Sequence, residues 1–175
     1  RSVAHWLTEA HRRQKKLSRA APELAPRVAA VVEALEMHAT RLPARPLSLI
    51  HGDFPPDQLW THEGRLVLFD LDELALGHPM EDLAAFVCRI DNGPWPAQLG
   101  ATMREHLLRA YAAHAPAHFD VRHLAWQRTL QQLLQTTRAF VFQQPGWRAQ
   151  LEARLLRAEA NARAITEFLL WHPHN

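Results

Sequence analysis

The chain has 175 residues, enough for a single domain with one hydrophobic core. Its hydrophobic content of 47% and charged content of 22% are typical of globular proteins, and a net charge of +2 does not indicate a nucleic-acid partner. Neither a run of roughly 18 apolar residues nor a leader-like N-terminal pattern is present, so we expect a cytoplasmic protein without a membrane or nucleic-acid partner.

The first part of the chain predicts two helices. Residues 3–17 place apolar side chains on one face at helical spacing, and the basic stretch His11–Lys16 within them is expected to be a solvated helix face. A second helix begins near Pro22, which suits a first helical turn, and continues toward residue 41. The prolines of the following segment RLPARP end it.

Short apolar runs then predict a small β element. We expect strands at residues 47–50 and 65–71, and residues 58–62 pair with the second strand in a hairpin that turns at Glu63 and Gly64. The segment HGDFPPD between them is expected to be a loop, because it contains a glycine and a pair of prolines.

From Pro79 onward the pattern is helical. We expect a helix over residues 79–90, where Cys88 is a buried thiol, and another after Pro96. A third begins at Asp120 and continues to Val141, and a last one follows Gly146. The last helix repeats apolar residues every three or four positions, at Trp147, Leu151, Leu155, Ala158, Ala162, Ile165 and Leu169. The sheet is small, so the expected fold is α+β, mainly α, with a helical core.

Acidic and amide side chains stand beside the predicted strands. Asp53 follows the first strand, Gln58 begins the hairpin, and Asp70 and Asp72 lie at its end. Phosphoryl transfer needs a carboxylate that orients the acceptor hydroxyl and oxygen ligands that hold Mg²⁺. Because the hairpin brings its two ends together, these residues predict a metal-phosphate site, in which Asp72 is a candidate second carboxylate. His51 is expected to support the loop through packing and hydrogen bonds.

At these residues the sequence resembles the aminoglycoside phosphotransferase and choline kinase-like family. The resemblance lies in His51-Gly52-Asp53, Phe69-Asp70-Leu71-Asp72-Glu73, Gly77-His78-Pro79 and Asp82-Leu83-Ala84. It implies the C-terminal helical lobe of a protein kinase-like fold, with Mg²⁺ as cofactor and ATP or GTP as donor.

The resemblance also implies a role for each matching residue. Asp53 is similar to the catalytic base, Asp70 to the main Mg²⁺ ligand, and Asp82 to an acid that braces the catalytic loop. Gln58 occupies the second metal-ligand position, where the family usually has Asn. His78 replaces the usual Asp of the Gly-Asp-Pro motif.

The N-terminal lobe of that fold, with its phosphate-covering loop and lysine, is not found in the sequence. The lysines, Lys15 and Lys16, do not lie on a predicted strand, and the six glycines are scattered. We therefore expect residues 1–175 to form one domain, the C-terminal lobe of a longer kinase, with the ATP-clamping lobe absent and the fragment inactive alone. The complete protein is expected to phosphorylate a hydroxyl of an aminoglycoside, amino alcohol or sugar; no acceptor-binding residue is identified.

Two alternatives stay open at this point. A degenerate kinase lobe that binds without catalysis is consistent with Gln58 and with the missing lobe. A phosphohydrolase of the haloacid dehalogenase type also carries Asp-x-Asp after an apolar strand, as Asp70 and Asp72 do, and would use Asp70 as its nucleophile.

Overall fold

The computed structural model describes residues 1–171, with the side chains at 139 and 167–171 excepted. The chain forms two compact units, which we describe separately. Unit 1 contains Arg1 and Ala44–Leu124, and unit 2 contains Ser2–Pro43 and the described residues from Ala125 onward. The prediction of one domain over 1–175 stays a prediction.

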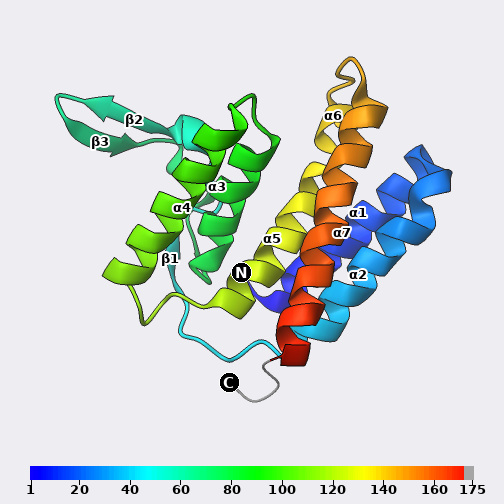
Figure 1. The fold of residues 1–175 in the computed structure, drawn as a ribbon, viewed down its shortest axis with the longest axis horizontal. Coiled ribbons are helices and arrows are strands. Elements are labelled where there is room, and N and C mark those ends of the chain that lie inside the picture. Colours follow the sequence, from blue (N-terminus) through cyan, green and yellow to red (C-terminus); the bar gives the residue numbers. More distant parts are fainter. Residues whose placement is uncertain (172–175) are drawn as a thin grey trace. The chain divides into compact units, whose positions relative to one another are not determined.

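Unit 2 is helical, and its helices α1, α2 and α7 run alongside one another (Figure 1). Its elements are α1 (Val3–Ala20), the short 3₁₀ helix η1 (Pro22–Leu24), α2 (Ala25–Ala39), most of α5 (Val121–Gln135), α6 (Arg138–Val141) and α7 (Trp147–Trp171). The side chain of Ser2 caps α1 by accepting a hydrogen bond from the backbone N–H of His5.

The core of unit 2 is built from the apolar faces that the sequence predicts. Its buried side chains are Trp6, Ala10, Leu17, Ala21, Leu24, Val28, Val31, Val32, Leu35, Trp126, Leu130, Leu133, Leu151, Leu155, Ala158 and Ile165. The indole Nε1 of Trp126 donates to the carbonyl of Leu35 at 2.9 Å, which satisfies the polar atom of this fully buried side chain. The predicted core position Leu169 lies outside the described side chains.

The helix predicted to continue to Val141 is interrupted after Gln135. The hydroxyls of Thr136 and Thr137 donate to the carbonyls of Leu133 and Leu134, at 2.5 and 3.2 Å. Such side-chain bonds compete with the helical ladder, and α6 begins only after them.

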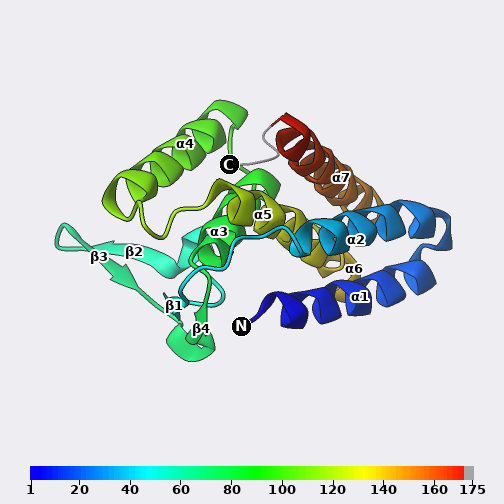
Figure 2. The ribbon, with the colours of Figure 1, turned by 90° about the horizontal axis from the view of Figure 1, so that it is seen from below.

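Unit 1 combines two antiparallel ribbons with helices. Its elements are β1 (Ser48–Ile50), the 3₁₀ helix η2 (Pro56–Gln58), β2 (Leu59–His62), β3 (Arg65–Leu68), the 3₁₀ helix η3 (Leu71–Glu73), β4 (Ala75–Gly77), α3 (Met80–Asn92) and α4 (Ala97–His114). β1 pairs with β4, and the β2–β3 hairpin between them in sequence projects away from α3 (Figure 2).

One strand is shorter than predicted, and another was not predicted. The strand predicted over 65–71 ends at Leu68, and Asp70 leaves the extended conformation by adopting a left-handed one at φ 59°. Residues 75–77 were not predicted as a strand, yet β4 pairs with β1 over three positions. Three residues are too few for a periodic pattern.

None of the described helices is long and apolar enough to cross a membrane.

Candidate functional site

The loop after β1 passes close to the residues that follow β3, and Gly52 makes this approach possible. Gly52 has a φ of 87°, and a β-carbon at this position would lie 2.1 Å from the carbonyl oxygen of Glu73. Any other residue would both strain the backbone and displace the η3 segment. The glycine of the His-Gly-Asp motif therefore allows the loop after β1 and the η3 segment, which both carry acidic residues, to lie in contact.

Asp82, in the first turn of α3, binds the same loop. Its Oδ2 accepts from the backbone N–H of His51 at 2.7 Å, and its Oδ1 accepts from that of Gly52 at 2.9 Å. Burial raises the pKa of the Asp82 carboxyl, while these two bonds and the positive charge of Arg1 act in the opposite direction. Both carboxylate oxygens are thus used to hold the loop, which is the contact that the predicted bracing role requires.

His51 links the loop to the end of the hairpin. Its Nε2 lies 2.9 Å from the carbonyl oxygen of Phe69, and because a carbonyl only accepts, this nitrogen carries the proton. The ring is buried and lies next to Phe54, which in turn contacts Phe86 on α3. The contacts of His51 are those of a supporting side chain.

Asp53 is placed differently from its neighbours. Its side chain is 54% exposed, and its Oδ1 forms an ion pair with Nη2 of Arg89 at 3.4 Å. A carboxylate held in this way is accessible to a substrate hydroxyl and keeps a cation beside it. Sequence reasoning missed Arg89, although it lies seven residues after Asp82, two turns along the same helix.

The hairpin brings Gln58 and Asp70 into contact. The backbone N–H of Phe69 donates to the carbonyl of Gln58 at 3.1 Å, and the side-chain Nε2 of Gln58 donates to Oδ2 of Asp70 at 2.8 Å. The amide oxygen Oε1 of Gln58 is buried and has no hydrogen-bond partner within the described residues. An unsatisfied buried oxygen beside a carboxylate is the kind of donor set that Mg²⁺ takes.

The remaining acid of this segment, Asp72, is exposed and has no hydrogen bond or ion pair in the part of the chain that the structure describes. Among the described residues, no group of three or more His, Cys, Asp and Glu side chains could hold a metal ion. Magnesium is commonly held by one or two carboxylates, with water and phosphate completing its shell. Asp70 and Gln58 fit this pattern as a partial set.

Arg1 and Glu81 form a second connection that the sequence did not indicate. Nη1 of Arg1 donates to the carbonyl of Gly52 at 2.6 Å and to the buried carboxylate of Glu81 at 3.1 Å. Nη2 of the same guanidinium pairs with the Glu73 carboxylate at 2.5 Å. One arginine thus joins the loop after β1, η3 and the start of α3. Isolated charges at 1, 73 and 81 have no spacing that would reveal this contact beforehand.

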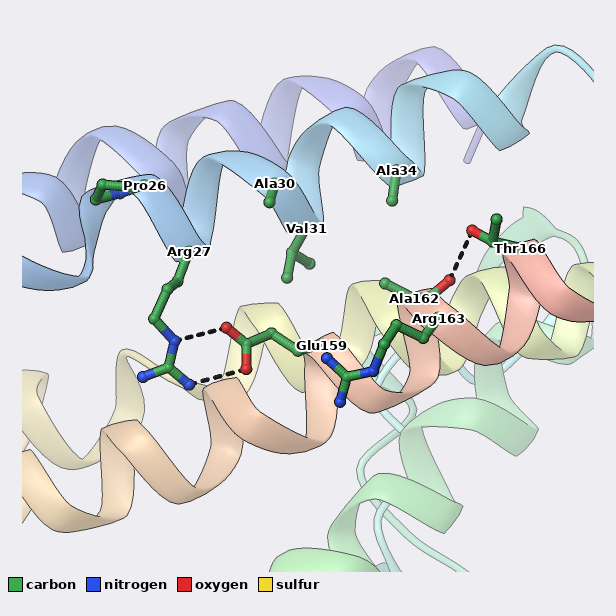
Figure 3. A pocket seen from close by; sticks show the side chains of 9 residues that line it. All are labelled: Pro26, Arg27, Ala30, Val31, Ala34, Glu159, Ala162, Arg163 and Thr166. Atoms are coloured by element: carbon green, nitrogen blue, oxygen red, sulfur yellow. Dashed lines mark hydrogen bonds and ion pairs between the residues drawn. The ribbon is translucent and has the colours of Figure 1, made fainter.

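Unit 2 contains a separate cavity of about 530 Å³ between α2 and α7 (Figure 3). Ala30, Val31, Ala34 and Ala162 form much of its lining, and the Arg27–Glu159 ion pair lies at one end. None of the acidic residues of the loop after β1, the hairpin, η3 and α3 lines this cavity.

Comparison with known proteins agrees with the pattern of the loop, the hairpin and α3. The family model described as "APH: Phosphotransferase enzyme family" matches residues 2–124, more than half of the chain. The chain belongs to this phosphotransferase family. A search of curated proteins found no match.

Among solved structures, this member of the phosphotransferase family is similar to a thermostable mutant of aminoglycoside phosphotransferase APH(4)-Ia in its apo form. The identity is 22% and the TM-score 0.51, so the likeness concerns the fold, which is mainly helical with small antiparallel sheets and kinase-like. The match covers 87% of this chain and 52% of that chain, so this sequence spans about half the length of the structure it resembles.

The family and the antiparallel sheets help to decide between the two alternative functions, a dehalogenase-type phosphohydrolase and a non-catalytic kinase lobe. A dehalogenase-type site needs its Asp-x-Asp after a strand of a parallel sheet, whereas the strand before Asp70 belongs to an antiparallel hairpin. The phosphotransferase assignment replaces that alternative. The non-catalytic kinase lobe stays open, because family membership does not measure activity.

Proposed function

We propose that the complete protein transfers the γ-phosphoryl group of ATP or GTP to a hydroxyl of a small molecule such as an aminoglycoside, an amino alcohol or a sugar. The observation that carries the proposal is the arrangement of the loop after β1. Asp82 holds the backbone of His51 and Gly52, and the next residue, Asp53, presents an accessible carboxylate. This is the arrangement that a base for an acceptor hydroxyl requires.

In this proposal each residue has a separate task. Asp53 orients the hydroxyl and accepts its proton, and the ion pair with Arg89 holds the carboxylate in place. Asp70 and the free Oε1 of Gln58 are the residues that would hold Mg²⁺, with Asp72 as a further candidate. The ion would supply charge stabilisation for the phosphates of the donor. The task of His51 and Asp82 is to hold the loop.

We also propose that residues 1–175 are the C-terminal part of the enzyme and need an N-terminal, nucleotide-clamping lobe. Large apolar side chains are exposed along residues 47–76 of unit 1: Leu47, Leu49, Trp60, Leu66, Leu68, Phe69, Leu71, Leu74 and Leu76. Such a concentration of exposed apolar side chains is typical of surfaces that are covered in the functional molecule. The fragment is therefore expected to show little or no transfer by itself.

The test is phosphoryl transfer by the complete gene product with ATP or GTP, Mg²⁺ and a panel of hydroxyl acceptors. Asp53→Asn should reduce kcat by roughly 10²–10⁴-fold, the usual contribution of a general base. Asp57→Asn is the matched control, because Asp57 is exposed, lies four residues away and undergoes the same loss of charge. Equal activity of Asp53→Asn and the control would remove the proposed base.

A non-catalytic lobe is the second candidate, and Gln58 is the observation that favours it. The side-chain amide of Gln58 is occupied by Asp70, an interaction that competes with metal binding. Absence of transfer by the complete protein with every donor and acceptor, together with intact folding, would support this candidate. Magnesium-dependent transfer would exclude it.

A further inference from the structure

We propose that a basic cleft between α1 and α6 in unit 2 binds a small molecule that carries a chain of phosphate groups. The cleft is lined by Arg12, Lys15, Lys16, Arg19, Ala20 and Phe140 and has a volume of about 410 Å³. This volume lies in the range of ~300–1,000 Å³ found for small-molecule sites. All of its lining belongs to unit 2, and the proposal does not depend on the phosphotransferase activity of unit 1.

The charge of the cleft is one-sided. Four of its six lining residues are cations, and no carboxylate is among them. Arg12 pairs with Glu9 at 2.5 Å, but Lys15, Lys16 and Arg19 have no hydrogen bond or ion pair among the described residues. Positions three and four apart lie on the same face of a helix, so these cations repel one another. An anion in the cleft would relieve that repulsion.

The walls of the cleft are held in place from behind. The opposite face of α1 is buried through Trp6, Ala10 and Leu17, so α1 cannot turn its cations away. Arg13 Nη1 donates to the hydroxyl of Thr137, the residue before α6, at 2.7 Å. The ring of Phe140 packs against Trp147 with centroids 5.2 Å apart. A solvated helix face needs none of these connections, whereas a binding site gains from walls that are already formed.

The residue types indicate what the cleft would bind. Lysine ammonium groups and arginine guanidinium groups both donate strong hydrogen bonds to phosphate oxygens. Several cations in a row match an extended polyanion better than a single carboxylate. Phe140 adds one apolar surface, against which a base can stack if the ligand is a nucleotide. The limited volume favours a small molecule over a long nucleic-acid strand.

The experiment is calorimetric titration of the 175-residue chain at low salt without divalent cations. Inorganic tripolyphosphate and a nucleoside triphosphate are the two probes. We expect a dissociation constant below ~1 mM for at least one of them, and weaker binding as salt is added. The variant Lys15→Gln/Arg19→Gln should bind at least about tenfold more weakly, because each residue loses hydrogen bonds from a charged group.

Controls separate this site from general charge effects. Arg65→Gln/Arg109→Gln removes the same two charges from exposed positions in unit 1 and should leave binding unchanged. Phe140→Leu should weaken the binding of the nucleoside triphosphate and leave the binding of tripolyphosphate unchanged, which would identify a nucleotide ligand. If Phe140→Leu binds both probes as the unchanged protein does, the cleft recognises the phosphate chain alone.

Three outcomes would overturn the proposal. The first is no binding of either probe below ~1 mM. The second is equal loss of affinity in the cleft variant and the control variant. The third is affinity for single-stranded oligonucleotides that rises with their length far beyond that for either probe, which would indicate a strand-binding surface instead of a small-molecule site.

Discussion

The two units differ in what holds them together. In unit 2, a large set of buried apolar side chains from five helical segments forms one core. In unit 1, the buried cluster is smaller, with Met80, Leu83, Ala84 and Leu124, although further apolar side chains of α3 are also buried. The acid-bearing segments of unit 1 are joined by polar contacts. Apolar packing is tolerant of small displacements, whereas hydrogen bonds to a loop fix it within a narrow geometry. The unit that carries the candidate site is therefore the one that depends on individual polar groups.

The comparison predicts the largest loss of stability from the core of unit 2. Trp126→Ala should lower the free energy of unfolding by roughly 3–5 kcal/mol, because it opens a cavity and removes the indole hydrogen bond to the carbonyl of Leu35. Urea denaturation followed by circular dichroism measures this. Leu156→Ala, at an exposed position of α7, should change it by less than ~0.5 kcal/mol. Similar losses in both variants would contradict the description of the core.

In unit 1 the critical residue is polar. Asp82→Ala leaves the backbone N–H groups of His51 and Gly52 without their acceptor, at a cost of roughly 1–3 kcal/mol for each group that water cannot reach. These two amides should also exchange hydrogen faster, which can be measured by NMR. Asp72→Ala serves as control, since its side chain is exposed and unbonded within the described residues. Unchanged exchange in Asp82→Ala would refute the bracing contact.

Acid should also weaken unit 1. His78 stacks on His123 with ring centroids 3.8 Å apart, and its Nδ1 accepts from the backbone N–H of Met80 at the start of α3. Burial, and then the nearby His123, lower the pKa of His78 from 6.5 to about 4. Asp120 partly opposes this effect, whereas Arg45 and His118 add to it.

The sign of the pH dependence follows from that direction. The native state favours the neutral ring, so its contribution is complete above pH 6.5 and is lost as the pH falls toward about 4. The loss is at most ~3 kcal/mol. The free energy of unfolding, measured in urea at several pH values, should fall less steeply in His78→Gln. His62→Gln, at an exposed position, should keep the native slope. Identical slopes in all three proteins would contradict the assignment.

The smallest change in the free energy of unfolding is expected from the Arg27–Glu159 ion pair of unit 2. Nε and Nη2 of Arg27 donate to the two oxygens of Glu159 at 2.6 and 2.8 Å, but both side chains contact solvent. Glu159→Gln should therefore cost about 0.5–1 kcal/mol, and less at high salt. The hydrogen bond from Arg27 lowers the pKa of Glu159, so this contribution is lost in acid. The exposed Glu33 provides the control Glu33→Gln. A loss as large as that of Trp126→Ala would invalidate the ranking.

Much of the fold could be predicted because helices repeat their apolar positions. The second helix was expected from near Pro22 toward residue 41, and its apolar residues Val28, Val31, Val32 and Leu35 are all buried. The strand β4 could not be predicted in the same way, because it has three residues and its partner β1 lies on the other side of the hairpin in the sequence. The end of β3 was missed for a local reason: Asp70 reads as part of an apolar run but adopts a left-handed conformation.

For the candidate site, the sequence by itself determined which residue types are available and roughly where they lie along the chain: His51, Asp53, Gln58, Asp70, Asp72 and Asp82. It did so because motifs depend on short spacings, which the chain preserves whatever the remainder does. Only the tertiary structure decided which of these groups touch. Arg89 beside Asp53, and Arg1 between Gly52, Glu73 and Glu81, are contacts between residues 36 to 80 positions apart. Such contacts form when separate elements pack, and no local pattern in the sequence records them.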